Sequence, residues 1–265
     1  MTDPAHPAPT SVAALVSARR PADVVTAAGH HLGDLLTGTG FAWSTRRRNL
    51  TRTVESVTHE VSLQPSSMNR AAGTITVQTV LILHDAALTT WRRANPGRCL
   101  LPDQGGWAIG HPLGYAAGRA NGYVYGDFPD GEIDLTDPAR RPAALATFAA
   151  VVRDAVLPWF DEAGNPDRAV VTVPGDRTNS PSSLVEWLAA RDRPDLVEPY
   201  LERCLRRNPT WGDRLRLGHE LAAAGRHPFP TYGGDLAVCL GWSASPASAR
   251  SGMGTRGAAG GGEVA

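Results

Sequence analysis

Residues 57–64 alternate between apolar and polar side chains, and no other part of the chain constrains the fold so tightly. One side of this segment carries Val57, His59, Val61 and Leu63, and the other carries Thr58, Glu60, Ser62 and Gln64. Alternation with a period of two is the geometry of a β-strand with one buried face. The sequence therefore predicts a sheet with one face against the core and a polar opposite face.

Further strands are predicted on both sides of this segment. Residues 74–84 alternate in the same way at their start, but their second face changes from Thr76 and Gln78 to Val80 and Ile82. We expect that end of the strand to be covered on both faces. Shorter strands are predicted near Phe41 and Trp43 and in the ranges 107–110, 123–128 and 169–173.

Helical spacing dominates the rest of the chain. Pro21 opens a predicted helix that extends to about Thr37, and Asp137-Pro138 is a predicted cap for the longest helix, whose apolar stripe runs over residues 145–159. Ser183-x-x-Glu186 is typical of a capping box. Helices are then expected from Pro194, over 210–225 and over 235–242.

These elements predict an α+β protein. We expect a two-layer fold with an antiparallel sheet of about four to five strands, helices on one face, and a C-terminal helical extension. Composition divides the chain into a Pro- and Ala-rich disordered tail (1–10), the α+β domain (11–180), the helical extension packed on it (181–242) and a Ser-, Ala- and Gly-rich disordered tail (243–265).

The charge balance narrows the possible functions. The 26 basic residues are all Arg and match 26 acidic ones, so there is no bulk attraction to nucleic acid. Without lysine, the chain has no Schiff base or P-loop lysine. Neither an uninterrupted membrane-length apolar run nor a secretory leader is recognisable, so we expect a cytoplasmic protein that does not enter a membrane. Cys99, Cys204 and Cys239 are widely spaced, which favours buried free thiols.

The order of several short motifs resembles a bacterial family known only as a domain of unknown function (DUF 4304). The motifs are Gly40-Phe41, a strand with Arg52, then Leu63-Gln64-Pro65-Ser66 with Asn69, Ile109-Gly110, and Leu157-Pro158-Trp159-Phe160. The resemblance covers roughly residues 22–162. It implies a two-layer α+β fold with an antiparallel sheet, and it implies no activity. Ala108 stands where the resemblance leads us to expect an Arg before Ile109.

Familiar catalytic and cofactor motifs are incomplete in this sequence. His219-Glu220 begins a zinc-protease motif, but Ala223 occupies the position of the second ligand. Gly38-Thr39-Gly40 lacks the last glycine of a dinucleotide fingerprint, because Trp43 stands there. The acidic group Asp127, Asp130, Glu132, Asp134 and Asp137 does not have the spacing of a calcium loop and is interpreted as solvated charge. No cofactor and no metal are therefore expected.

Two surface features suggest binding. Residues 41–100 carry an excess of Arg over acidic residues, concentrated at Arg46, Arg47, Arg48 and Arg52. The polar strand face carries Glu60, Gln64 and Gln78, and Trp43 and Trp107 were expected to flank it. Arg and aromatic side chains often dominate protein interfaces. Our first hypothesis is a non-catalytic protein that docks a protein partner on this face, as toxin-neutralising immunity proteins do; that comparison is an analogy of fold alone.

Two other hypotheses remain open. A small hydrolase-like enzyme would use His59 or His111 with Glu60 or an acidic loop residue, and would need a polar-lined pocket beside them. A weak nucleic-acid binder would use the segment Arg46 to Arg52. The sequence does not determine the partner or the oligomeric state.

Overall fold

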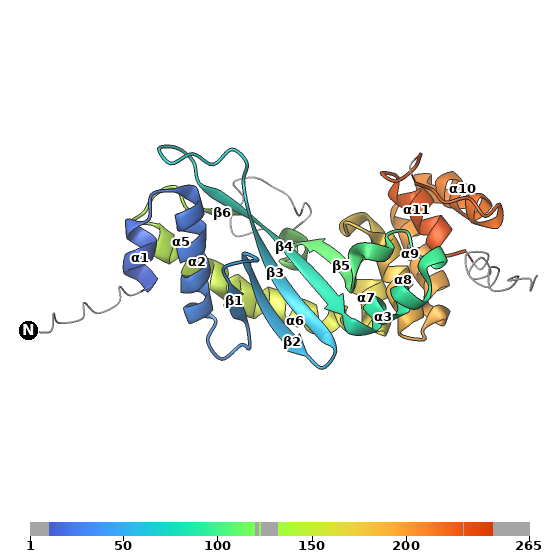
Figure 1. Cartoon of the computed structure of the whole chain (residues 1–265), viewed down its shortest axis with the longest axis horizontal. Coiled ribbons are helices and arrows are strands. Elements are labelled where there is room, and N and C mark those ends of the chain that lie inside the picture. The colour runs from blue at the N-terminus through green and yellow to red at the C-terminus, as the bar shows by residue number, and fades with distance from the viewer. Residues whose placement is uncertain (1–10, 120–121, 123–131, 230, 246–265) are drawn as a thin grey trace, which may run out of the picture. The chain divides into compact units, whose positions relative to one another are not determined.

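A computed structural model describes residues 11–119, 122, 132–229 and 231–245, and the chain divides into two compact units. The α+β unit comprises residues 1–86 and 107–179, and the helical unit comprises residues 87–106 and 180–265 (Figure 1). The sequence had assigned residues 87–106 to the α+β domain. Their contacts group them with the C-terminal helices instead, so two separate stretches of chain build the helical unit. The predicted tail 1–10 lies outside the described residues, as do residues 246–265 of the other tail.

The α+β unit contains an antiparallel sheet of six strands, which confirms the predicted fold class. The strands follow the order β1-β2-β3-β4-β5, and β6 also pairs with β4. Their bounds are β1 Ala42–Ser44, β2 Asn49–Val54, β3 Val57–Pro65, β4 Thr76–Asp85, β5 Trp107–Pro112 and β6 Glu132–Asp134. The predicted strand at 123–128 lies outside the described residues.

The strand register fixes which side chains share a face. Paired residues in an antiparallel sheet point to the same side. His59 pairs with Leu83 and Arg52, and Leu83 pairs with Ile109, so these belong to one face, which is buried along β3 and β4. We call this the helix-side face. On the opposite face, Val80 is buried and Ile82 is half-buried. The prediction that this end of β4 is covered on both faces is therefore confirmed only in part.

The helices of the α+β unit supply its second layer. Figure 1 shows α5 behind α2 and α6 behind β2 and β3. The helices are α1 Ser11–Ser17, α2 Pro21–Leu35, α4 Leu113–Ala116, α5 Arg141–Val151, α6 Leu157–Ala163 and α7 Pro166–Thr172, with a π-helical turn at Val152–Val156 and a 3-10 turn at Gly175–Arg177. The apolar stripe predicted over 145–159 is buried at Leu145, Phe148, Val152, Val156 and Trp159.

The segment Arg141–Ala163 is one long helix with a change of pitch in its middle. Pro158 lacks an N–H and its ring collides with the carbonyl four residues earlier. The π-helical turn Val152–Val156 directly before it widens the helix and relieves that collision. By length and composition alone, Arg141–Ala163 could also cross a membrane. Core helices pass the same test, and Phe148 and Phe160 of this helix are fully buried in the unit.

Local capping changes two of the predicted elements. Residues 169–173 form the end of α7 and not a strand, because Pro166 sits in the first turn and the Asn165 side chain accepts hydrogen bonds from the N–H groups of Asp167 and Arg168. The long helix begins at Arg141 and not after Asp137. The Asp137 carboxylate instead accepts from the N–H of Ala139 in a turn that precedes the helix.

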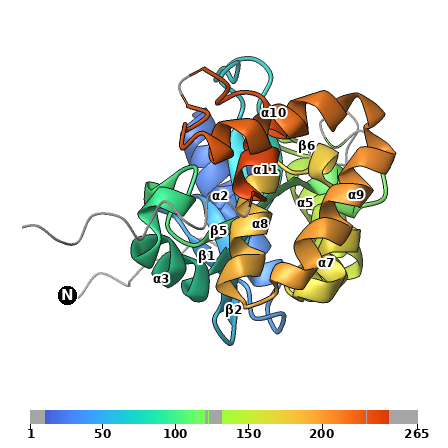
Figure 2. The same ribbon diagram turned by 90° about the vertical axis from the view of Figure 1, so that its right-hand side faces the viewer.

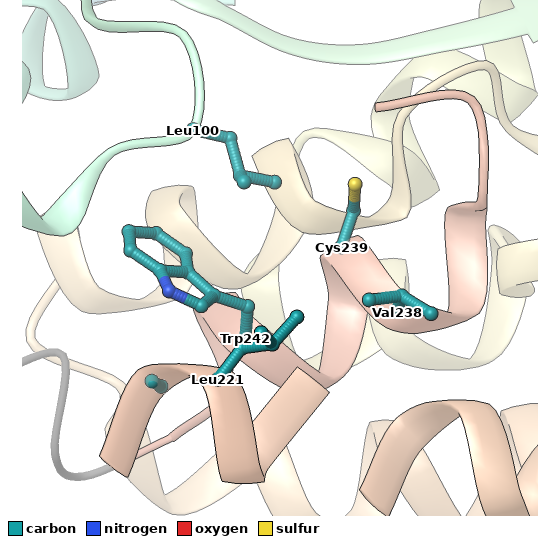
Figure 3. Close-up of a cluster of buried hydrophobic side chains, with 6 residues drawn as sticks. Leu100, Leu221, Val238, Cys239 and Trp242 are labelled. Carbon is teal, nitrogen blue, oxygen red and sulfur yellow. The ribbon is translucent and has the colours of Figure 1, made fainter. Parts of the chain in front are cut away.

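The helical unit is built from short helices around its own core. They are α3 Ala86–Ala94, α8 Pro181–Ala190, α9 Val197–Arg207, α10 Gly212–Ala223 and α11 Leu236–Ser243, with 3-10 turns at Pro96–Arg98, Pro102–Gln104, Pro194–Leu196 and Pro209–Trp211 (Figure 2). The core cluster in Figure 3 joins the segment before β5 to the last two helices: Leu100, Leu221, Ala222, Val238, Cys239 and Trp242. The helices predicted over 210–225 and 235–242 correspond to α10 and α11.

Two glycines allow α10 and α11 to cross closely. A Cβ at Gly218 would lie 2.2 Å from the carbonyl oxygen of Val238, and a Cβ at Gly241 would lie 2.2 Å from that of Leu215. Both obstacles are backbone atoms, which cannot rotate away. The crossing therefore requires glycine on both helices.

Gly218→Ala is expected to force the two helices apart and lower the free energy of unfolding by about 1–3 kcal/mol, the usual cost of overpacking. Gly212→Ala is the matched control, since a Cβ at Gly212 meets no atom within 4 Å. Urea denaturation followed by circular dichroism measures both. Equal stability of the two variants would contradict the close crossing.

Candidate functional site

The polar face of the sheet brings together side chains from β3, β4 and β5. Across the strands, Gln64 pairs with Gln78, Glu60 with Ile82 and Thr58 with His84, and the last row continues to Trp107 of β5. We define the polar face by these residues together with Ser62: Thr58, Glu60, Ser62, Gln64, Gln78, Ile82, His84 and Trp107. Gln64 is exposed and the other seven are half-buried. Val80 and Pro112, which pair with each other on the same side of the sheet, are buried, so this face is covered in part.

A hydrogen-bonded pair, Glu60 and His84, lies on the polar face. The His84 Nε2 atom is 3.4 Å from the Glu60 carboxylate. Burial alone would raise the pKa of Glu60, but hydrogen bonds from His84 and Asn49 and the charge of Arg47 lower it below its usual value. Glu60 is therefore held as a carboxylate with a fixed orientation.

Trp107 lies against the backbone of its own strand. A Cβ at Gly110 would come within 2.6 Å of the indole ring, so the ring occupies the space that a side chain would take. Gly110 pairs with Ile82, which puts the indole beside the Ile82 side chain. Glycine at 110 thus sets the position of the aromatic group.

Two residues of the predicted binding set lie on the helix-side face. Arg52 pairs with His59, so its side chain is on the helix-side face, where it forms an ion pair of 3.0 Å with Asp161 of α6. Trp43 pairs with Leu50 on the same side and packs on α2, where a Cβ at Gly29 would lie 2.1 Å from its ring. Trp43 therefore does not flank the polar face as predicted, and Arg52 is separated from the exposed arginines of the predicted basic group, because period-two alternation along β1 and β2 directs both side chains toward the helices.

Arg46 and Arg48 lie in the turn between β1 and β2. Both are exposed, and so is Arg47 between them. Arg48 has a φ of 54°, a left-handed conformation that closes the turn. The turn presents three cations at one edge of the sheet.

A second constellation lies on the helix-side face at a cavity of about 320 Å³. His59 and Asp161 line this cavity, and Arg52 reaches both: its guanidinium donates to Nδ1 of His59 at 3.3 Å and to Asp161. The His59 ring stacks on Phe160 with centroids 4.5 Å apart and planes 3° from parallel. The remaining wall consists of Val54, Glu55, Val57, Gly164, Asn165 and Pro166.

The surroundings of His59 make it a hydrogen-bond donor and a poor base. Burial, and next the charge of Arg52, lower its pKa to about 4, although Asp161 acts in the opposite direction. With Nδ1 accepting from Arg52, the proton of the neutral ring is on Nε2. A general base for chemistry near neutral pH needs a pKa much closer to 7.

The predicted pairing of His59 with Glu60 does not occur. They are consecutive residues of β3, so Glu60 points to the polar face and His59 to the helix-side face. His111 is 1% exposed and stacks on Trp159 with centroids 4.8 Å apart, and the charged group that acts on it among the described residues is Arg177, not an acid. Burial lowers its pKa to about 4.

Metal ligands do not gather in the part of the chain that the structure describes. Within it, no three His, Cys, Asp or Glu side chains form a group suited to a metal ion. Asp127 and Asp130 of the acidic group lie outside the described residues.

Sequence reasoning missed a buried ion pair in the helical unit. Glu186 of α8 accepts from Nε of Arg92 at 2.7 Å and from the N–H of Leu100 at 2.9 Å, and Arg92 also donates to Ser183. Ser183 and Glu186 therefore do not form the predicted capping box; both are inside α8, which starts at Pro181. One signal was available: Glu186 stands in an apolar run, between Val185 and Trp187.

Comparison with known proteins gives no relative: no family model matches the chain, and no curated protein or solved structure matches it either. The resemblance to the DUF 4304 family stays a prediction.

Proposed function

We propose that this protein is a non-catalytic binding protein that docks a partner protein on the polar face. One observation carries the proposal: α2 and α6 pack on the helix-side face, through contacts with Trp43 and His59, while the eight residues that define the polar face are half-buried or exposed. A sheet face that is only partly shielded offers a rigid surface on which another protein can bind.

The chemistry of the polar face resembles the anatomy of a protein interface. Trp107 and Ile82 form an apolar group at one end of the face beside Glu60 and His84. Ser62, Gln64 and Gln78 continue the face toward its other end with neutral donors and acceptors. Interfaces concentrate their binding energy in a few aromatic anchors and use a polar rim to exclude water. Trp107 is the expected anchor, because Gly110 holds its ring in place.

The arginine turn indicates the charge of the partner. Arg46, Arg47 and Arg48 are exposed at the edge of the sheet, and Arg47 is near enough to Glu60 to lower its pKa. A partner with an acidic patch opposite this turn would gain both association rate and orientation.

The two alternative functions receive less support. Nucleic-acid binding was predicted to use Arg52, but Asp161 already neutralises that guanidinium. Hydrolysis was predicted to use His59 or His111 with Glu60 or an acidic loop residue, but the group that contacts Nδ1 of His59 is Arg52. An arginine there disfavours the imidazolium that a general base must become.

Placing a charge on the polar face is expected to weaken partner binding at least tenfold. Gln64→Glu and Gln78→Glu, made separately, place a negative charge on the polar face, where it would repel the acidic patch proposed for the partner. Affinity capture from the source lysate identifies the bound protein, and titration of that protein gives the dissociation constants. Thr147→Glu is the matched control, since Thr147 is exposed on α5 of the same unit. Unchanged affinity in both face variants, or equal loss in the control, would contradict the proposal.

A further inference from the structure

The helical unit contains a cavity of about 260 Å³ that the proposed function does not use. Its wall is formed by residues of α3, α8, α9, the end of α11 and two 3-10 turns, all of them within this unit: Trp91, Arg98, Val185, Glu186, Ala189, Pro194, Val197, Ser243, Ala244 and Ser245. The volume is just below the roughly 300 Å³ at which pockets for drug-sized ligands begin. A small organic molecule is the size of ligand that it could accept.

Most of the wall is apolar. Val185, Ala189 and Val197 are on neighbouring helices, and Trp91 adds an aromatic surface. Such a wall favours the apolar body of a ligand over water.

The one carboxylate in the wall is already satisfied. Glu186 is 2% exposed and accepts hydrogen bonds from Arg92 and from the N–H of Leu100. Its charge is balanced by Arg92 at 2.7 Å, so it does not attract a cation into the cavity.

Arg98 supplies a charge that is not balanced in this way. Its guanidinium carbon lies 5.2 Å from the centre of the Trp91 ring, and its Nε is buried with no hydrogen-bond partner among the described residues. Ser243 also lines the cavity, and its Oγ is buried with no hydrogen-bond partner among the described residues. Buried donors without partners are rare and costly, so each indicates a place where a ligand could supply a hydrogen-bond acceptor.

We propose that this cavity binds a small monocarboxylate with an apolar body. The carboxylate would accept from Nε and a terminal N–H of Arg98, the fork geometry that carboxylates match, and from the hydroxyl of Ser243. The apolar body would lie against Val185, Ala189 and Val197. This site is independent of the polar face and does not rest on the proposed function.

Calorimetric titration of the full chain with phenylacetate and with 4-methylpentanoate tests the proposal. We expect at least one of them to bind, and the uncharged analogue phenylacetamide to bind at least tenfold more weakly than phenylacetate. Inorganic phosphate tests for a site that recognises charge alone. Failure of both acids to bind at 10 mM (about the weakest affinity that such a pocket would give) would overturn the proposal, as would equal affinity for phenylacetamide or phosphate.

Variants then connect binding to the cavity. Arg98→Gln is expected to weaken phenylacetate binding at least tenfold, and Ala189→Leu is expected to abolish it by filling the space. Arg93→Gln removes an exposed arginine of the neighbouring helix α3 and should leave the affinity unchanged. Thermal unfolding checks that each variant folds. Wild-type affinity in folded Arg98→Gln, or in folded Ala189→Leu, would overturn the proposal.

Discussion

Glu186→Leu is expected to lower the free energy of unfolding of the helical unit by about 3–5 kcal/mol, the usual cost of removing one partner from a buried ion pair. Arg92 is 1% exposed, so after the substitution its charge would remain in the protein interior without a carboxylate. The N–H of Leu100 would also lose its acceptor. Urea denaturation, with the helical unit followed by Trp fluorescence and circular dichroism, measures the loss.

The double variant distinguishes the cost of leaving the Arg92 charge buried and unpaired from the net contribution of the ion pair to stability. Arg92→Met combined with Glu186→Leu removes both charges and keeps apolar volume, and such replacements are often close to neutral. The carbonyl of Gly105 would still lose its donor and the N–H of Leu100 its acceptor, at about 1–3 kcal/mol for each group left unsatisfied. We therefore expect the double variant to be more stable than the sum of the two single effects predicts.

Arg93→Met is the control for this cycle. It changes the exposed neighbour of Arg92 and should alter stability by no more than about 0.5 kcal/mol. Strictly additive single effects, or a loss below about 1 kcal/mol for Glu186→Leu, would show that the buried pair does not act as a unit.

The fold was predictable where a local pattern decides the structure. The alternation in β3 arises from neighbours in the chain, and the same is true of the stripe on the long helix and of Gly225 after α10. Each of these signals is complete within about ten residues. They were sufficient for the α+β class and for the helical C-terminal part.

Arg52 shows a signal that was present and misinterpreted. In β2, the residues Leu50, Arg52 and Val54 alternate with Asn49, Thr51 and Thr53. Period two therefore puts Arg52 on the apolar side of its strand, despite its charge. Composition alone suggested a surface cation, but the register shows a helix-side group neutralised by Asp161.

Other features depend on partners that no local pattern contains. Glu186 is 94 residues from Arg92, and Asp161 is 109 residues from Arg52. Ser183-x-x-Glu186 fits a capping box as well as it fits a buried face, because both use the same helical spacing. Only the tertiary packing distinguishes them.

Two buried histidines make the stability of the α+β unit depend on pH. His59 stacks on Phe160 and His111 stacks on Trp159, so consecutive residues of α6 hold the two rings. The charged groups near His59 are Arg52 and Asp161, and the one near His111 is Arg177. Burial is the main cause that lowers the pKa of each ring to about 4, and both rings are therefore neutral in the folded protein above that pH.

The sign of the effect follows from which state takes up the protons. The usual pKa of histidine is about 6.5, so above it neither the folded nor the unfolded chain protonates these rings. Between pH 6.5 and 4 the unfolded chain binds two protons that the folded chain does not, and the free energy of unfolding falls as the pH falls. The pair is expected to contribute a loss of about 3–4 kcal/mol between pH 7 and pH 5.

Urea denaturation at pH 7, 6 and 5 measures this loss, and His59→Gln and His111→Gln assign it. Each substitution removes one titrating ring, so each is expected to halve the contribution of the pair over this range, whatever it costs at pH 7. His30→Gln removes an exposed ring from the same unit without touching either stack, and should keep the wild-type pH dependence. A wild-type slope in both buried variants would mean that the folded protein can protonate His59 and His111, and the stacks on α6 would then not keep them neutral.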